Sequence, residues 1–425
     1  MKIYINPEKS YWPQLCTRPA FDYASLEGLV APILDNIKTD GDTALRKYAA
    51  QFDNVQLDAL KVTTEEFNTA AAIVPTALKQ AITQAAANIR LFHEAQKETI
   101  LQIYTMPGVL CWRKSVGISN VGLYIPGGTA PLFSTLLMLG IPAQIAGCNN
   151  IILCTPSNAE GKINETILFT AELLGLKNVF KLGGVQAIGA MAYGTASVPK
   201  VSKIFGPGNQ YVTAAKQMVN RQGTAIDMPA GPSELAVYAD ETAVPAFVAS
   251  DLLSQAEHGI DSQVILVASS EKIVLAVQDE VNKQLYHLPR KEVAAIALTH
   301  SRYVVIESVY TAFDFLNEYA AEHLIIASDA ALELSEKVIN AGSIFLGHYS
   351  PESAGDYASG TNHTLPTNGY AKAYSGVSVD SFVKKITFQQ LSKEGLAFIG
   401  NTIELMAEAE GLEAHRNAVA IRIKK

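Results

Sequence analysis

The chain is poor in cysteine, and its cysteines are not arranged in pairs. Cys16, Cys111, Cys148 and Cys154 are spread over 425 residues without a Cys-x-x-Cys motif. So few thiols in so long a chain exclude a disulfide framework and are typical of a reducing compartment. Because the first residues also lack the continuous apolar core of a secretory signal, we expect a cytoplasmic protein.

Charge is scarce as well. Charged residues make up 17% of the chain against 48% hydrophobic residues, and the formal net charge is -8. Soluble proteins carry about 25% charged residues, so this composition indicates much buried or interfacial surface and excludes a disordered chain. Since no block of lysine and arginine appears and the net charge repels phosphates, nucleic acid is not an expected partner.

No uninterrupted run is long and apolar enough for a membrane helix. The longest stretch without charge or histidine covers residues 115–159, but it is broken by Pro126, Gly127, Pro131 and Pro142, among others. A membrane helix needs about 20 predominantly apolar residues without such breaks, so we expect no membrane span. An uncharged, glycine-rich backbone of this kind is suited to a buried segment that lines a cofactor groove.

Hydrophobic spacing divides the chain into a helical part and an alternating part. Residues 21–100 carry apolar side chains at three- and four-residue spacing, and Thr63-x-x-Glu66 predicts a capping box at the start of a helix running to Phe92. After residue 120, short β-branched or aromatic runs alternate with helical stretches, which predicts an α/β fold with parallel, doubly wound sheets. The predicted strands cover residues 151–154, 179–182, 203–205, 235–238, 264–268, 303–307 and 343–346.

Three glycine-rich segments, each beside a predicted strand and ahead of a helix, are candidate anion-binding turns. They cover residues 122–128, 182–187 and 206–211. Backbone N–H groups and a helix N-terminus meet at such turns, as phosphate binding requires. None matches Gly-x-Gly-x-x-Gly, and ordinary turn chemistry explains any one of them. Three in one part of the chain also fit a dinucleotide lying across an open sheet.

Two pairs of polar residues in the C-terminal half are candidates for metal binding and proton transfer. Gln255 and His258 stand three apart in a helix predicted to start near Pro245, so both could reach one metal ion. Glu322 and His323 are neighbours at a predicted helix end, where side chains about 100° apart could take separate proton-transfer roles. Asp356 lies in a predicted Gly/Ser-rich loop, and the remaining candidates are His363, Glu410 and His415.

No local motif joins these residues into one site. A single histidine is more commonly structural than a ligand, and spacing alone does not assemble a metal site from ligands spread over residues 255–415. The chain has neither His-Glu-x-x-His nor Gly-x-Ser-x-Gly. His93, His287 and His300 stand in charged or polar surroundings and are predicted to have no specific role.

The chain resembles the histidinol dehydrogenase family in motifs that follow the family's order from about Asp22 to Val419. Gly259 and Lys372 depart from the family's usual aspartate and arginine, and neither position is assigned to chemistry. The motifs are residues 122–131, 182–187, 205–216 (FGPGNQYVTAAK), 227–234 (DMPAGPSE), 252–258 (LLSQAEH), 322–324 (EHL), 362–367 (NHTLPT) and 410–419 (EGLEAHRNAV).

The resemblance implies two Rossmann-like, incomplete and doubly wound α/β domains with small tail segments in an intertwined homodimer. It places the metal and catalytic residues in a first domain made of residues 21–122 and 232–378. The second domain, residues 123–231, would bind NAD. Residues 1–20 and 379–425 would be tails that pack on the partner subunit, so that the C-terminal tail completes the partner's active site.

The resemblance also implies a function, the zinc- and NAD-dependent oxidation of L-histidinol to L-histidine through L-histidinaldehyde, the last steps of histidine biosynthesis. The zinc ligands fall on Gln255, His258, Asp356 and His415, the catalytic pair on Glu322 and His323, and the NAD contacts on Tyr124, Gln186 and Asn209. Substrate contacts fall on Ser233, His363, Glu410, His323 and the four metal ligands. The alternatives are a paralogue that oxidises a different amino alcohol on the same scaffold, and a non-catalytic metal- or nucleotide-binding protein.

Overall fold

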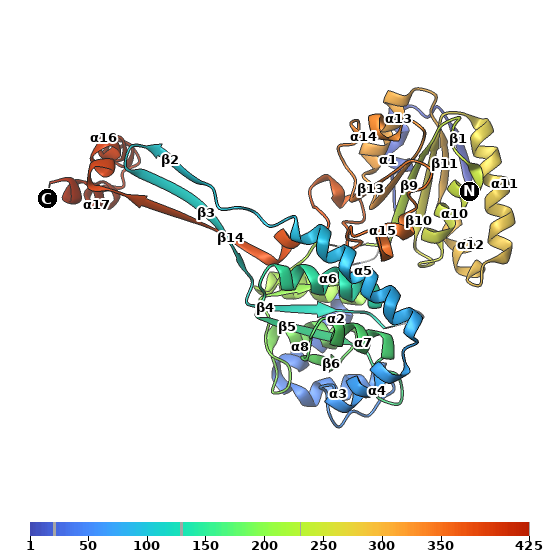
Figure 1. The fold of residues 1–425 in the computed structure, drawn as a ribbon, viewed down its shortest axis with the longest axis horizontal. Coiled ribbons are helices and arrows are strands. Elements are labelled where there is room, and N and C mark those ends of the chain that lie inside the picture. The colour runs from blue at the N-terminus through green and yellow to red at the C-terminus, as the bar shows by residue number, and fades with distance from the viewer. Residues whose placement is uncertain (20–22, 128–130, 230, 425) are drawn as a thin grey trace.

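The computed structural model describes residues 1–19, 23–127, 131–229 and 231–424. These residues form two α/β units and an arm that projects away from them (Figure 1). The N-terminus lies in the first unit, and the C-terminal helix lies at the far end of the arm. Among the described residues, no helix combines the length and the apolar character needed to cross a membrane.

The first unit is built on a six-stranded, fully parallel sheet with helices on both faces. Its central strands are largely apolar because both of their faces are buried. In spatial order they are β1 (Lys2–Ile5), β11 (Arg302–Val305), β10 (Gln263–Ala268), β9 (Glu234–Ala239), β12 (His323–Ala327) and β13 (Ser343–Leu346). One face is covered by α10 (Pro245–Ala256), α11 (Glu271–His287) and α12 (Lys291–Thr299). The other is covered by α1 (Trp12–Leu15), α13 (Val309–Tyr319) and α14 (Ala331–Ser335).

The second unit is a five-stranded parallel sheet, again between two helical layers. Its strands, in spatial order, are β6 (Val179–Lys181), β5 (Asn150–Thr155), β4 (Asn120–Tyr124), β7 (Lys203–Phe205) and β8 (Ala225–Ile226). The core on one face includes α4 (Thr64–Ile73), α5 (Thr76–Glu94), α6 (Phe133–Ile145) and α7 (Glu165–Leu173). The core on the other includes α2 (Tyr23–Asp40), α3 (Asp42–Phe52), α8 (Gly184–Tyr193) and α9 (Gln210–Arg221).

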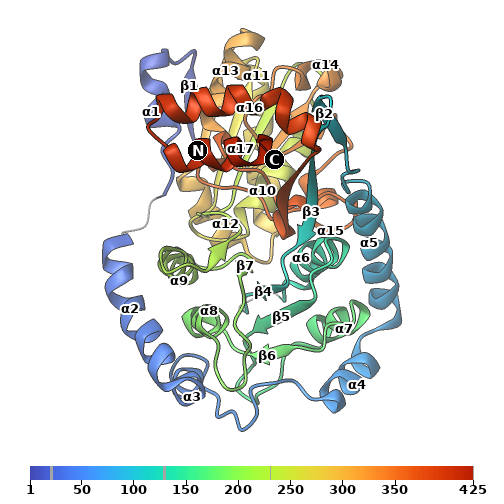
Figure 2. The ribbon, with the colours of Figure 1, turned by 90° about the vertical axis from the view of Figure 1, so that its left-hand side faces the viewer.

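The arm combines segments that lie far apart in the sequence. Its antiparallel sheet consists of β2 (Gln102–Met106), β3 (Val109–Gly117) and β14 (Val383–Leu391). Two helices, α16 (Lys393–Ala409) and α17 (Glu413–Ile423), lie side by side at its end (Figure 2). Short elements complete the fold: η1 (Lys9–Tyr11), α15 (Glu352–Tyr357), η2 (Tyr370–Lys372) and η3 (Val379–Phe382).

The α/β prediction and all seven predicted strands are confirmed, and so is the capping box between Thr63 and Glu66. The helix predicted to run to Phe92 is instead divided into α4 and α5. Pro75 is the N-cap of α5 and has an extended backbone, because proline has no N–H for a continuing helix. Gly128, at the end of the first glycine-rich segment, lies outside the described residues.

The units divide the chain differently from the predicted domain boundaries. Residues 1–19, predicted to be a tail on the partner, contribute β1, which pairs with β11 of the same chain. The helices between residues 23 and 94, predicted to belong with residues 232–378, pack on the second unit instead. The reason lies in α2, whose Val30 and Leu34 are buried in the core that also contains α8 and α9.

Candidate active site

The larger of two cavities that share Asn209 lies at the carboxyl ends of β4, β5 and β6, beneath α2 and α3. It measures about 1130 Å³. All three glycine-rich segments contribute to it, and so do Tyr124, Gln186 and Asn209, the three residues predicted to contact NAD. Ligands of open α/β sheets bind at this end of the strands, so the structure unites the predicted dinucleotide residues in a position suited to one.

Hydrogen bonds hold these three side chains in place. The Tyr124 hydroxyl accepts from the Gly184 N–H at 3.0 Å, and burial raises the pKa of Tyr124 to about 12. Gln186 Nε2 donates to Asp53 Oδ2 at 3.1 Å, and burial raises the pKa of the Asp53 carboxyl. Asn209 is the N-cap of α9, where its side-chain oxygen accepts two backbone N–H groups. Asp53 was missed by sequence analysis because no motif surrounds it.

The glycine-rich loop before α9 requires glycine at Gly206. Its φ is +124°, and an added Cβ would collide with the Tyr124 carbonyl oxygen. A buried ion pair fixes the loop. Lys216 Nζ donates to the Gly206 carbonyl at 2.8 Å, and Asp227 accepts from the Gly206 N–H at 2.8 Å. The loop therefore holds Asn209 at the cavity with little freedom.

The smaller cavity, about 580 Å³, brings together four residues that sequence analysis had linked only through the family resemblance. Ser233, His258, Glu322 and His363 line it. Asn209 lines both cavities, so the two lie next to each other. A dinucleotide in the larger cavity would thus end close to a small molecule in the smaller one.

Glu322 and His323 were predicted to lie at a helix end, but both lie beyond the helix. The helix α13 stops at Tyr319, Ala320 adopts a left-handed conformation, and His323 is the first residue of β12. Glu322 is the residue just before this strand, and its Oε2 lies 3.8 Å from His323 Nδ1.

A cluster of buried groups surrounds His323. Its Nδ1 lies 3.5 Å from Glu352 Oε1 and 3.8 Å from Glu322 Oε2, while its Nε2 lies 3.7 Å from Asp356 Oδ1. Neither ring nitrogen has a hydrogen-bond partner among the described residues. Burial, together with the nearby His363 and His258, lowers the pKa of His323 to about 3. The imidazole is therefore neutral near pH 7.

The three carboxyl groups of this cluster are buried, and burial disfavours their negatively charged forms. Burial raises the pKa of Asp356 to about 7 and raises those of Glu322 and Glu352 well above the ordinary value. Such groups are stabilised as anions when a cation joins them. His323, Glu352 and Asp356 place ligand-type atoms within 4.8 Å of one another, an arrangement that fits a metal ion.

Two of the predicted metal ligands, Gln255 and His258, come from the end of α10 and the residues that follow it. The helix starts at Pro245 as predicted but ends at Ala256, so His258 follows the helix. Gln255 is fully buried, and both its amide oxygen and its amide nitrogen lack a partner among the described residues. A buried, unpaired amide is costly, and a metal ion would satisfy its oxygen.

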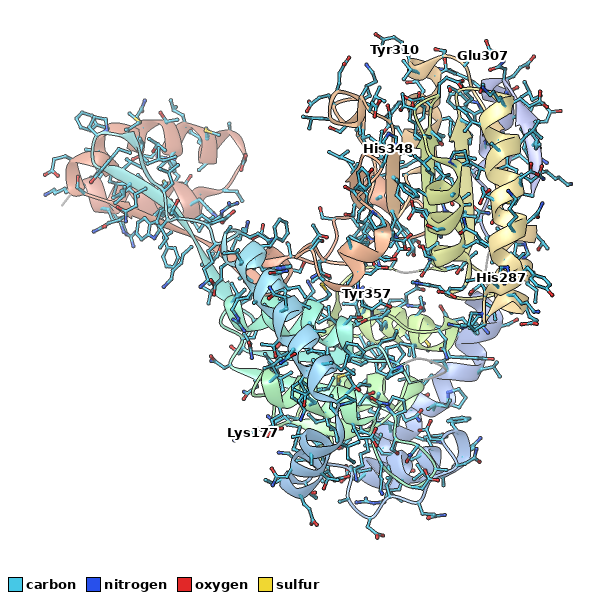
Figure 3. The ribbon with its side chains drawn as sticks, turned by 45° about the vertical axis from the view of Figure 1, so that its right-hand side comes forward. Lys177, His287, Glu307, Tyr310, His348 and Tyr357 are labelled. Atoms are coloured by element: carbon cyan, nitrogen blue, oxygen red, sulfur yellow. The ribbon has the colours of Figure 1, made fainter. Side chains whose placement is uncertain are left out.

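Asp356 belongs to the helix α15, not to a loop as predicted. The helix begins at Glu352, and residues four apart share one face, which places both carboxylates toward the site. This spacing was the signal that could have revealed Glu352. Tyr357, at the end of α15, lies where the first unit faces the second (Figure 3).

His363 is held from both sides. Its Nδ1 lies 2.9 Å from the Asp356 carbonyl oxygen, and its Nε2 lies 3.0 Å from Thr135 Oγ1 of α6. Burial lowers the pKa of His363 to about 4. His93, for which no specific role is predicted, is fully buried, and its Nε2 lies 3.4 Å from Asn362 Nδ2, next to His363.

Glu410 and His415 are not brought to the site within one chain. Glu410 follows α16 and His415 lies in α17, at the end of the arm, and both side chains are exposed (Figure 1). Among the four predicted metal ligands, His415 is therefore the one that lies on the arm.

Comparisons with known proteins agree over nearly the whole length of the chain. The sequence profile of a family described as histidinol dehydrogenase matches residues 16–423. The histidinol dehydrogenase of Bacteroides thetaiotaomicron is 57% identical over 423 residues, covering 100% of this chain and 99% of that protein. That of Salmonella typhimurium is 51% identical, covering 96% and 94%. The crystal structure of histidinol dehydrogenase from Elizabethkingia anophelis superposes with a TM-score of 0.98 at 55% identity, covering 100% and 98%. The chain belongs to the histidinol dehydrogenase family.

Proposed function

We propose that the protein oxidises L-histidinol to L-histidine through L-histidinaldehyde, using two NAD, in the last steps of histidine biosynthesis. The observation that carries this proposal is the pairing of the two cavities at Asn209, with Glu322 in the wall of the smaller one. The alternative paralogue finds no support in the comparisons, because the similar proteins named above are all histidinol dehydrogenases.

The proposed zinc site consists of Gln255, His258 and Asp356 with His415 of a second copy. The unpaired amide of buried Gln255 supports it, and amide, imidazole and carboxylate are ligands suited to zinc. When bound, zinc would orient the imidazole and amine of the substrate, and NAD would accept the hydride.

The residues of this chain would move the protons. His323 is neutral near pH 7 and has no hydrogen-bond partner among the described residues, so it can accept the proton of the substrate hydroxyl in the first oxidation. Burial raises the pKa of Glu322, which strengthens it as a base. Glu322 would take a proton from the water that attacks the aldehyde, and His323 would accept a second proton as the acid forms.

We also propose an intertwined homodimer of Rossmann-like units in which the arm completes the partner's active site. The exposed position of Glu410 and His415 supports this, since both are expected to contact substrate. Large apolar side chains are exposed on the arm, which is typical of an interface. They include Leu101, Ile103, Tyr104, Phe398, Leu405 and Met406. All four cysteines are free, which supports a cytoplasmic location.

The test is the amount of NADH formed per histidinol consumed, with the zinc-loaded protein and after chelation. Two NADH per histidinol, lost on chelation and restored by zinc, would support both oxidations and the metal site. Absence of NADH with zinc bound would contradict the proposal, and other amino alcohols would then be screened as substrates.

A further inference from the structure

We infer that Arg18 is a positioning residue for the carboxylate of Glu322. Arg18 lies in the N-terminal segment after α1, far from Glu322 in the sequence and without contact to either cavity. The inference rests on the proposed role of Glu322 and concerns how that carboxylate is held.

The first step is the contact that orients Glu322. Its Oε2 accepts a hydrogen bond of 3.0 Å from the backbone N–H of Glu234, the first residue of β9. Glu322 directly precedes β12, which pairs with β9. The direction of the carboxylate therefore depends on how the start of β9 lies against the chain before β12.

The second step is that Arg18 binds both of these segments. Its Nε and Nη2 donate to the two carboxylate oxygens of Glu234, whose side chain is almost fully buried. Nη2 also donates to the carbonyl of Tyr319, three residues before Glu322, and the guanidinium lies 4.0 Å from the Tyr319 ring centroid. One planar group thus joins the segment that carries the carboxylate to the segment that carries its N–H donor.

The third step is that the ion pair between Arg18 and Glu234 fixes geometry more than it adds stability. A buried ion pair gains little stability over an apolar pair, because both charges lose their water. Within the part of the chain that the structure describes, the Glu234 carboxylate has one further hydrogen bond, from the Gly369 N–H at 3.4 Å to Oε1. A bidentate pair in this place chiefly fixes geometry, and errors of about 1 Å in a catalytic group cost up to about a hundredfold in rate.

The experiment distinguishes an effect on the position of the Glu322 carboxylate from a general loss of protein stability. Single-turnover assays would compare alcohol oxidation with aldehyde oxidation in the wild type, R18Q, R18K, E322Q and the double variant. For R18Q we expect a loss of about tenfold in aldehyde oxidation and a smaller loss in alcohol oxidation. R18K should recover only part of the rate, because lysine keeps the charge but not the planar, two-pronged contact.

The double variant gives the decisive readout. If Arg18 acts through Glu322, adding R18Q to E322Q should not lower aldehyde oxidation further. A matched control is R302Q, because Arg302 also donates to this segment, at the Thr17 carbonyl, but has no contact with Glu234. R302Q should leave the ratio of the two rates unchanged.

Equal losses in both oxidations for R18Q, or losses that multiply with those of E322Q, would overturn the inference. Should R18Q fail to fold, R18K and E234Q provide the same comparison. The proposed role of Glu322 is judged separately, by E322Q alone: if it slows both oxidations equally, that role fails whatever Arg18 does.

Discussion

Thr135 and His363 are joined by a hydrogen bond between the two units, with 3.0 Å between Oγ1 and Nε2. Thr135 lies in α6 of the second unit, and His363 lies in the segment that follows α15. The carbonyl oxygen of Asp356 at Nδ1 can only accept, so Nδ1 carries the ring proton and the Thr135 hydroxyl donates to Nε2. The contact links the substrate side of the site to the unit proposed to bind NAD.

Replacing Thr135 tests this link. T135V keeps the shape of the side chain but leaves the buried Nε2 without a donor, which should lower the free energy of unfolding by about 1–3 kcal/mol. T135S keeps the hydroxyl and should lose much less. Urea unfolding of both variants is the measurement, and equal stability of T135V and wild type would contradict a contribution of this hydrogen bond to stability.

The roles of Glu322 and His323 should separate by reaction step. E322Q should lose aldehyde oxidation by about a hundredfold or more while alcohol oxidation is less affected, because only the second step needs water to be activated. Single-turnover assays with histidinol and with histidinaldehyde measure the two steps. A variant that loses both steps to the same extent would argue against separate roles.

His415 offers a test of the shared site. H415A should bind zinc more weakly, and metal content after dialysis measures this. H415A and H323A should each be inactive alone, yet unfolding and refolding a mixture should restore about a quarter of the wild-type activity. In a mixed dimer, one of the two sites would then combine an intact His323 with an intact His415. If no activity returns although mixed dimers form, the arm does not complete the partner's site.

Asp251 of α10 should make stability depend on pH. Burial raises its pKa to about 7 in the folded protein. An unfolded chain has an aspartate pKa near 4, so the unfolded state loses this proton first and stability falls as the pH rises from about 4 to about 7. D251N removes this contribution and should reduce the fall in unfolding free energy by on the order of 1 kcal/mol.

The measurement for Asp251 is urea unfolding of the metal-free protein at several pH values. D279N is the matched control, since Asp279 is exposed on α11 and its replacement also removes one negative charge. The same pH slope in D251N and wild type would show that Asp251 ionises in the folded protein as it does in the unfolded chain.

Local sequence patterns predicted the secondary structure well wherever a single local feature of the sequence determines it. The apolar strands of both sheets and the capping box at Thr63 follow from side-chain spacing, and the glycine-rich turns were found because few residues tolerate such backbones. Prediction failed at His323, because a short strand directly after a helix gives the same apolar pattern as a longer helix. The burial of His93 could not be predicted, because polar neighbours in the sequence do not show which face of α5 is buried.

The sequence by itself determined the α/β class, the three turns that line the larger cavity and, through its motifs, the family. Only the tertiary structure decided which segments share a unit, as β1 and β11 do, and which charged residues form ion pairs. Arg18 and Glu234 stand 216 positions apart and yet form one buried pair. Local spacing governs helices and strands because their hydrogen bonds join near neighbours. Contacts between distant residues depend on how whole buried faces pack, which no single stretch of sequence encodes.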